Sequence, residues 1–174
     1  MELHIVLHQP EIPQNTGSIG RTCMAMDASL HLIHPLGFSI NDKLLRRAGL
    51  DYWHELDPSI YENWESFLSR NNNPPLWYLT TKASRSYDEV AFRSPTYLVF
   101  GKETAGLPMS ILSGIPEKCL RIPMLKEARS LNLSVAVGIV ACEVLRQHNF
   151  SNLQKTDPQN RLSDQSEPIP AKSE

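Results

Sequence analysis

Short apolar runs alternate with amphipathic or polar stretches along most of the chain. The run at residues 3–7 is followed by Pro10 and Pro13, so it predicts a buried strand that leads into a loop. Further strands are expected at 29–33, 76–80, 96–100 and around 120–122, and helices at 15–26, 41–47, 58–70 and 132–147. Strands that alternate with helices predict an α/β fold with a mostly parallel sheet and helices on both faces.

The last predicted helix has the most informative pattern. Pro123 cannot continue a sheet ladder and 126–129 is highly charged, so a solvated loop should precede a helix that starts near Asn132. Residues 135–142 are apolar on all sides, which predicts packing on two faces, one of them against a second subunit or, in the plainer alternative, within an ordinary core. Apolar residues recur at helical spacing at Leu133, Val137, Val140, Ala141, Val144 and Leu145.

Composition sets the domain organisation. A chain of 174 residues with 41% hydrophobic residues can bury one core of ordinary size. Residues 1–150 are therefore expected to form one domain. Residues 151–174 are mostly polar and contain few aliphatic side chains, so they are expected to form a disordered tail.

The charge balance argues against binding to nucleic acid through bulk electrostatics, because the net charge is −2. Any RNA contact would need a local basic patch, and the densest candidate is formed by Lys43, Arg46 and Arg47. Weaker candidates are the pairs at 82 and 85 and at 126 and 129. Each of these clusters alone is more typical of a solvated surface than of an RNA contact.

Cysteine and histidine usage does not indicate a metal or a disulfide framework. The three cysteines are odd in number and far apart, and the histidines have no cysteine or carboxylate at ligand spacing. No stretch is long enough to span a membrane and the first residues do not resemble a secretory signal, so a cytoplasmic protein is expected. A dinucleotide-binding enzyme is disfavoured because the loop after the first strand lacks G-x-G-x-x-G.

Three motifs occur in a fixed order: N-x-G-x-x-x-R at 15–21, F-G-x-E-x-x-G-L-P at 100–108, and I-P-M followed by S-L-N-L-S between 122 and 134. They resemble the signature motifs of the SPOUT superfamily of RNA methyltransferases, over roughly residues 3–147. Within that superfamily the chain is most similar to the single-domain tRNA wobble-nucleotide 2′-O-methyltransferases. The segments GFSINDKLLRRAGLDYW and LTTKA also resemble that group.

The resemblance implies a SPOUT fold with a deep C-terminal trefoil knot, and a pocket for S-adenosylmethionine that needs no metal. It implies that Arg21 is catalytic and that Asn15 positions its loop. An arginine stays protonated at neutral pH, so binding a phosphate and stabilising the developing alkoxide suits Arg21 better than acting as a base. Glu103 could face the sulfonium or orient its loop. The implied cofactor-binding residues are Leu79, Gly101, Glu103, Ile122, Met124, Ser130, Leu131 and Asn132.

Three positions depart from the pattern of the wobble enzymes: Ala105 replaces a basic residue, Val135 an asparagine and Cys142 a tyrosine. They leave the exact RNA target open. The alternatives are methylation of another tRNA or ribosomal RNA ribose, a non-catalytic RNA-binding module of the same fold, and a nucleotide-binding regulatory domain. Catalysis is expected to require a homodimer in which Arg21 of one subunit faces the cofactor loops of the other.

Overall fold

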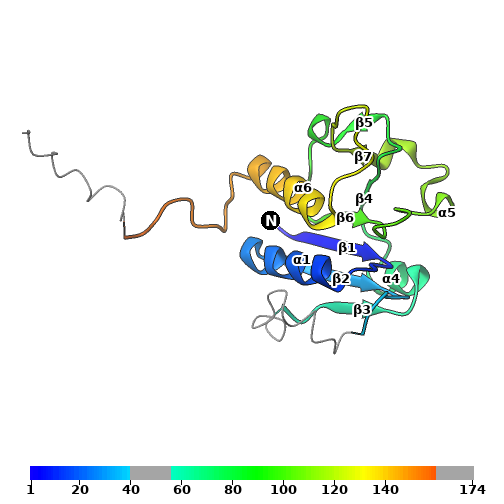
Figure 1. Ribbon diagram of the computed structural model, residues 1–174. Helices are drawn as coiled ribbons and strands as arrows, with labels where there is room; N and C mark the ends of the chain where they lie inside the picture. The colour runs from blue at the N-terminus through cyan, green and yellow to red at the C-terminus, as the bar shows by residue number, and fades with distance from the viewer. Residues whose placement is uncertain (40–55, 160–174) are drawn as a thin grey trace, which may run out of the picture.

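The computed structural model describes residues 1–39 and 56–159. Its centre is a seven-stranded sheet in which all hydrogen-bonded neighbours run parallel, in the order β3-β2-β1-β6-β4-β7-β5 (Figure 1). The strands are β1 (Leu3–His8), β2 (Ala28–Ile33), β3 (Ser59–Tyr61), β4 (Leu76–Leu79), β5 (Arg85–Ser86), β6 (Thr96–Phe100) and β7 (Cys119–Arg121). The fold class expected from the sequence is therefore confirmed.

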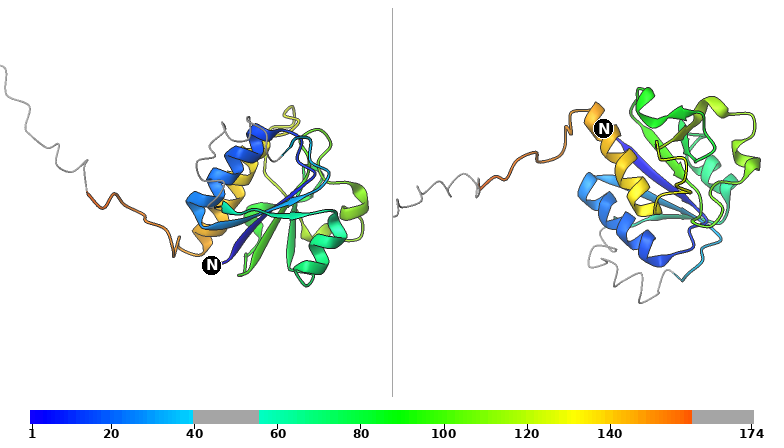
Figure 2. Two further views of the ribbon diagram at one scale, coloured as in Figure 1. Left: turned by 90° about the horizontal axis from the view of Figure 1, so that it is seen from below. Right: turned by 45° about the horizontal axis from the view of Figure 1, so that its top comes forward.

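Helices cover both faces of this sheet. The helices α1 and α6 lie side by side on one face, and α4 lies on the other (Figure 2). The described helices are α1 (Pro13–Met26), α4 (Trp64–Arg70), α5 (Met109–Leu112) and α6 (Leu133–Gln147), with 3₁₀ helices η2 (Tyr87–Glu89) and η3 (Pro116–Lys118). None of the helices in the described ranges is both long and apolar enough to cross a membrane.

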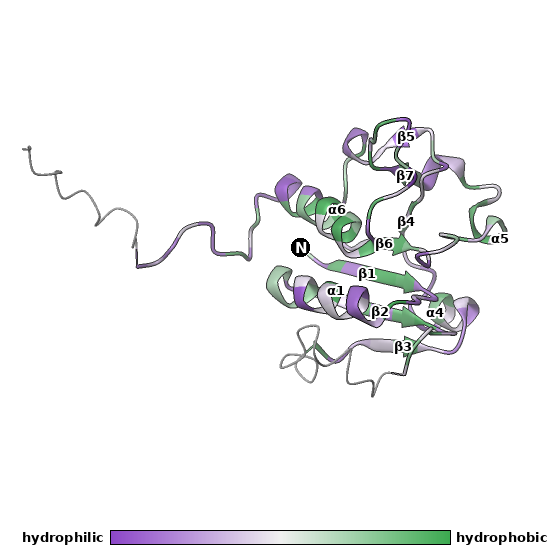
Figure 3. Ribbon diagram, viewed as in Figure 1, coloured by the Kyte–Doolittle hydropathy of each residue, from purple (hydrophilic) through white to green (hydrophobic). Residues whose placement is uncertain are grey.

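The alternation of side chains along β1 explains how one strand serves two cores. Leu3, Ile5 and Leu7 pack in the core beneath α1 and α6, whereas Val6 packs with Phe67 of α4 in the core on the opposite face. A strand in the middle of a parallel sheet is buried on both sides, so it reads as a continuous apolar run. Figure 3 shows this hydrophobic character in the central strands and along most of α6.

The expected helix at 58–70 is wrong in its first half. Ser59–Tyr61 forms β3, which pairs in parallel with β2, and the helix begins only at Trp64. Asn63 causes the late start, because its side chain accepts a hydrogen bond from the backbone N–H of Ser66 (2.8 Å) and caps the first turn. The helix expected at 41–47 lies outside the described residues.

The expected start of α6 is confirmed. The Oδ1 atom of Asn132 accepts a hydrogen bond from the backbone N–H of Ser134 (2.9 Å), and the buried side of the helix carries five of the six apolar residues expected from its spacing. Its other side carries Val135, which is 50% exposed, and the exposed Cys142. The single chain therefore leaves part of this apolar helix uncovered. The trefoil knot stays a prediction.

Candidate active site

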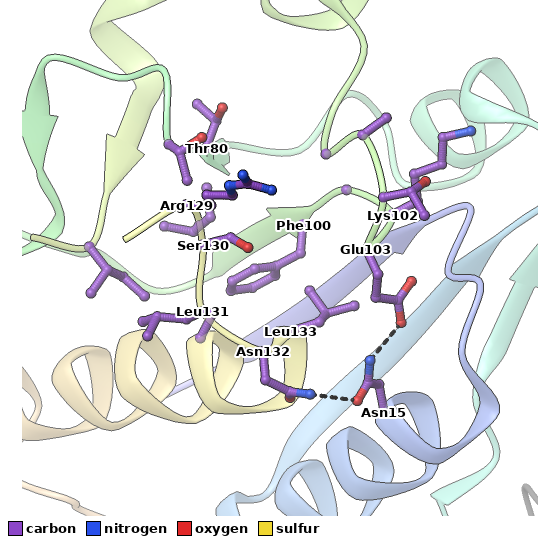
Figure 4. Close-up of a pocket in the computed structure, with 18 of the residues that line it drawn as sticks. Asn15, Thr80, Phe100, Lys102, Glu103, Arg129, Ser130, Leu131, Asn132 and Leu133 are labelled. Carbon is purple, nitrogen blue, oxygen red and sulfur yellow. Dashed lines mark hydrogen bonds between the residues drawn. The ribbon is translucent and has the colours of Figure 1, made fainter. Parts of the chain in front are cut away.

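A cavity of about 580 Å³ opens at the carboxyl ends of β4, β6 and β7 (Figure 4). Loops that follow parallel strands meet at one edge of the sheet, which is where such folds bind ligands. The first turns of α1 and α6 complete the wall, through Ile12, Asn15 and Asn132 among others. All eight residues expected to bind a cofactor line this one cavity: Leu79, Gly101, Glu103, Ile122, Met124, Ser130, Leu131 and Asn132.

A chain of side-chain hydrogen bonds joins the three sequence motifs (Figure 4). The Nδ2 atom of Asn15 donates to Oε1 of Glu103 (2.9 Å), and Nδ2 of Asn132 donates to Oδ1 of Asn15 (3.0 Å). Asn15 is 8% exposed, and both of its hydrogen bonds are partly buried. Asn132 at the same time caps α6. This series of hydrogen bonds thus fixes the starts of α1 and α6 against the loop after β6.

The Glu103 carboxylate joins its loop to the start of α1. Besides Asn15, its carboxylate accepts hydrogen bonds from the backbone N–H groups of Glu11 (2.8 Å) and Ile12 (3.3 Å). These groups lie at the start of α1, where the helix dipole also favours a negative charge. Of the two roles considered for Glu103, these three hydrogen bonds support the orientation of the loop.

The glycine at 101 is required by the protein's own backbone. A Cβ atom at this position would lie 2.1 Å from the carbonyl carbon of Gly106 and 2.2 Å from the nitrogen of Leu107. Gly106 has a φ of +68° and donates its N–H to the carbonyl of Lys102 (2.8 Å), so 101–107 is a tight turn. The missing side chain at Gly101 thus makes room for the returning half of this turn, and Gly101 also lines the cavity.

Arg21, which is expected to be catalytic, is placed differently from the cofactor set. Arg21 is exposed on α1 and does not line the cavity of its own chain. Lys43, Arg46 and Arg47 lie outside the described residues. The cations that line the cavity are Lys82, Lys102 and Arg129.

Figure 4 shows how two of these cations are directed. Arg129 extends toward the middle of the cavity, while Lys102 points away from it. Within the described part of the chain, no group of three or more His, Cys, Asp or Glu side chains is placed to hold a metal ion.

Sequence reasoning missed Glu11 and Thr104. The Glu11 carboxylate accepts hydrogen bonds from the Thr104 hydroxyl (2.7 Å) and the Thr104 backbone N–H (3.1 Å). The hydroxyl bond is the main reason why the pKa of Glu11 is lowered from its usual value. The one signal in the sequence was an acidic residue just before a helix start, a position that the helix dipole favours.

The mixture of groups in the cavity suits a nucleoside-like ligand. Leu79, Ile122 and Leu131 supply apolar surface, and the loops that carry them supply backbone N–H and C=O groups that can match an adenine edge. Recognition of an adenine edge by backbone groups needs no charged side chain. The cavity can therefore hold a ligand with a flat apolar base and polar edges.

Comparison with known proteins agrees with this geometry. The family model described as the SpoU rRNA Methylase family matches residues 2–142. The tRNA (cytidine(34)-2′-O)-methyltransferase of Escherichia coli (strain K12) is 47% identical over 149 residues, which are 85% of this chain and 95% of that protein.

Solved structures of RNA methyltransferases are also similar to this chain. One that concerns "the 2-OH methylation of C/U34 on tRNA" has a TM-score of 0.80 and 44% identity, and the match covers 85% of this chain and 97% of that one. An AdoMet-bound rRNA methyltransferase from Sinorhizobium meliloti has a TM-score of 0.69 and 26% identity, with 83% of this chain and 56% of that one covered. With its three motifs joined at one cavity in a parallel α/β fold, the chain belongs to the SpoU family of RNA methylases.

Proposed function

We propose that this protein transfers a methyl group from S-adenosylmethionine to the 2′-hydroxyl of the wobble nucleotide, a cytidine or a modified uridine, in the anticodon of a tRNA. The observation that carries the proposal is the hydrogen-bond chain from Glu103 through Asn15 to Asn132, which brings the three motifs together at one cavity. The names of the E. coli relative and of the C/U34 structure support the wobble position.

The residues of the cavity fit the cofactor. Leu79, Ile122, Met124 and Leu131 would enclose the adenine, and backbone groups of the loops at 101 and 130 would bond its edge and the polar parts of the ligand. When bound, S-adenosylmethionine supplies an electrophilic methyl group on a sulfonium. Glu103 would act through the loop that it orients, because its carboxylate is already engaged by three donors.

The task of the acceptor side is to align a ribose hydroxyl and to help remove its proton. We assign this to Arg21. A guanidinium stays protonated, so it would bind the neighbouring phosphate and stabilise the developing alkoxide rather than act as a base. Because Arg21 does not line the cavity of its own chain, it would act on the cavity of a second subunit.

A homodimer therefore completes the site. The outer side of α6 carries Val135, Ile139 and Cys142 at positions i, i+4 and i+7, which lie on one helix face. A symmetric interface on this face would cover the exposed apolar surface and would give two chains one composite surface for tRNA. A basic patch at Lys43, Arg46 and Arg47 would contribute phosphate contacts, and the enzyme would work in the cytoplasm, where its substrate is found.

The test is a map of modified nucleosides in tRNA from cells with and without the gene, read by mass spectrometry. We expect one 2′-O-methyl group at the wobble position to disappear without the gene and to return in vitro with purified protein and S-adenosylmethionine. A methyl group lost from another ribose would support the alternative target. Unchanged methylation with retained RNA binding would support the non-catalytic module.

A further inference from the structure

Two short segments on either side of the cavity hold each other by crossed hydrogen bonds. Glu103 accepts the backbone N–H groups of Glu11 (2.8 Å) and Ile12 (3.3 Å). In return, Glu11 accepts the hydroxyl (2.7 Å) and the backbone N–H (3.1 Å) of Thr104. We call these four hydrogen bonds the Glu11 latch. They join segments that are more than 90 residues apart in the sequence.

Glu11 does not line the cavity, whereas the other three residues of the latch do. Ile12, Glu103 and Thr104 line the cavity, and Glu11 does not. Glu11 also precedes the first of the three motifs, so the proposed function assigns it no role. Glu11 can therefore affect a ligand through the residues that it holds.

The backbone of Glu11 is held from the outside as well. A Cβ atom at Gly37 would lie 2.6 Å from the Cα atom of Glu11, so the two backbones are in close contact. The N–H of Gly37 also donates to the carbonyl of Pro10 (2.9 Å). The segment at 10–12 is therefore held from two sides, by Gly37 and by the loop at 101–106.

We propose that Glu11 is a positioning residue that holds the 101–106 loop against the start of α1, and thereby sets the affinity of the cavity for S-adenosylmethionine. The inference rests on the proposed function because it takes this cofactor as the ligand. A charged carboxylate strengthens a hydrogen bond, and although both bonds to Glu11 are exposed to solvent, the two together fix Thr104, which is part of the cavity wall.

The test compares the affinities of four full-length proteins for S-adenosylmethionine by calorimetry. In Glu11→Ala both bonds to Thr104 are lost, and the dissociation constant should rise about tenfold. In Glu11→Gln an amide oxygen can still accept a hydrogen bond, so the loss should be smaller. The matched control is Glu89→Ala, because Glu89 also bonds a backbone N–H, that of Ser86 (3.3 Å), but lies away from the cavity. This control should stay within about twofold of the wild type.

Two further measurements separate positioning from a general loss of structure. The KM for S-adenosylmethionine should follow the dissociation constant, while the KM for tRNA stays at its wild-type value. The variant Thr104→Val removes only the hydroxyl bond, and its effect should not add to that of Glu11→Ala, because both break the same contact. If Glu11→Ala fails to fold, Thr104→Val alone still provides the test, because it should also raise the dissociation constant for S-adenosylmethionine.

The outcomes are distinct. An unchanged cofactor affinity in folded Glu11→Ala, additive effects with Thr104→Val, or a raised KM for tRNA alone would each overturn the latch. If the wild-type protein itself does not bind S-adenosylmethionine, the proposed function fails instead.

Discussion

At the scale of single residues, a buried polar network crosses the sheet face that carries α4. Asn71 donates to the hydroxyl of Tyr61 (3.1 Å), which is 2.9 Å from Nδ1 of His31, and Nε2 of His31 is 3.0 Å from Nδ1 of His4. If the Tyr61 hydroxyl donates to Nδ1, the Nε2–H of His31 donates to His4, and both rings are neutral. In this arrangement a proton added to Nδ1 of His4 would place two donors against each other, and a proton added to Nδ1 of His31 would force the Tyr61 hydroxyl to change from donor to acceptor.

This network predicts an acid-sensitive fold. Burial, and then the neighbouring His4, lower the pKa of His31 from 6.5 to about 4. Between these values the unfolded chain binds more protons than the folded one, so the free energy of unfolding should fall as the pH drops from 6.5 toward 4. The contribution of His31 to this fall is roughly 3 kcal/mol. Chemical denaturation across this range should show a weaker pH dependence in His31→Gln than in the wild type and in His34→Gln, which changes a histidine outside the network. Equal slopes in all three proteins would contradict it.

The glycines give a second prediction at this scale. Gly101→Ala puts a Cβ atom against the backbone of Gly106, so the turn must open, and cofactor binding should be lost. Gly106→Ala meets no atom within 4 Å and suffers only from its φ of +68°, which costs about 1 kcal/mol. Gly138→Ala, in the interior of α6 and also free of neighbours within 4 Å, should leave the protein as stable or more so. Calorimetry and thermal unfolding of the three variants would show whether this order holds.

At the scale of elements, α6 is built from two sides with different partners. Val137, Val140 and Val144 are fully buried beneath the sheet face, whereas Val135 is half exposed. The sequence had indicated an apolar helix with no polar side. The structure shows which side is left exposed in one chain, and the proposed dimer would place the second chain on that side.

This side of α6 predicts the oligomeric state. Val135→Asp should place a charge in the proposed interface and raise the dissociation constant of the dimer by more than about tenfold, because an unpaired charge is costly to bury. Sedimentation should then show monomers with intact secondary structure and little activity. Ser69→Asp adds the same charge to α4, on the opposite face of the sheet, and should leave the dimer unchanged. A Val135→Asp protein that remains dimeric would place the interface elsewhere.

Elements also show where pattern reasoning works. The apolar runs gave β1, β2, β4 and β6 within one or two residues, because a strand buried on both faces has few alternative readings. The pattern failed at β3, where Ile60, Trp64, Phe67 and Leu68 fall at helical spacing although Ile60 lies in a strand. Three residues at the edge of a sheet are held by pairing with β2, which local spacing does not contain.

At the scale of the whole molecule, the features that could not be predicted are contacts between residues far apart in the sequence. The motifs named the residues of the cavity, but periodicity alone contains neither the strand order nor the hydrogen bonds that join the motifs. Asn15 is 88 residues from Glu103 and 117 from Asn132, and a spacing rule reaches only a few residues. The Glu11 latch was missed for the same reason.

The packing of α6 against the first elements of the chain also bears on how the protein is made. The core under α1 joins Ile5 of β1 and Ile19 of α1 to Val140 and Val144 of α6. The ribosome produces β1 and α1 first and α6 more than a hundred residues later. Throughout that interval the apolar surface of β1 and α1 lacks its packing partner α6, and Asn15 lacks its hydrogen-bond partner Asn132. Chaperones would therefore meet this surface during synthesis, and the cavity would reach its final shape only after α6 has left the exit tunnel.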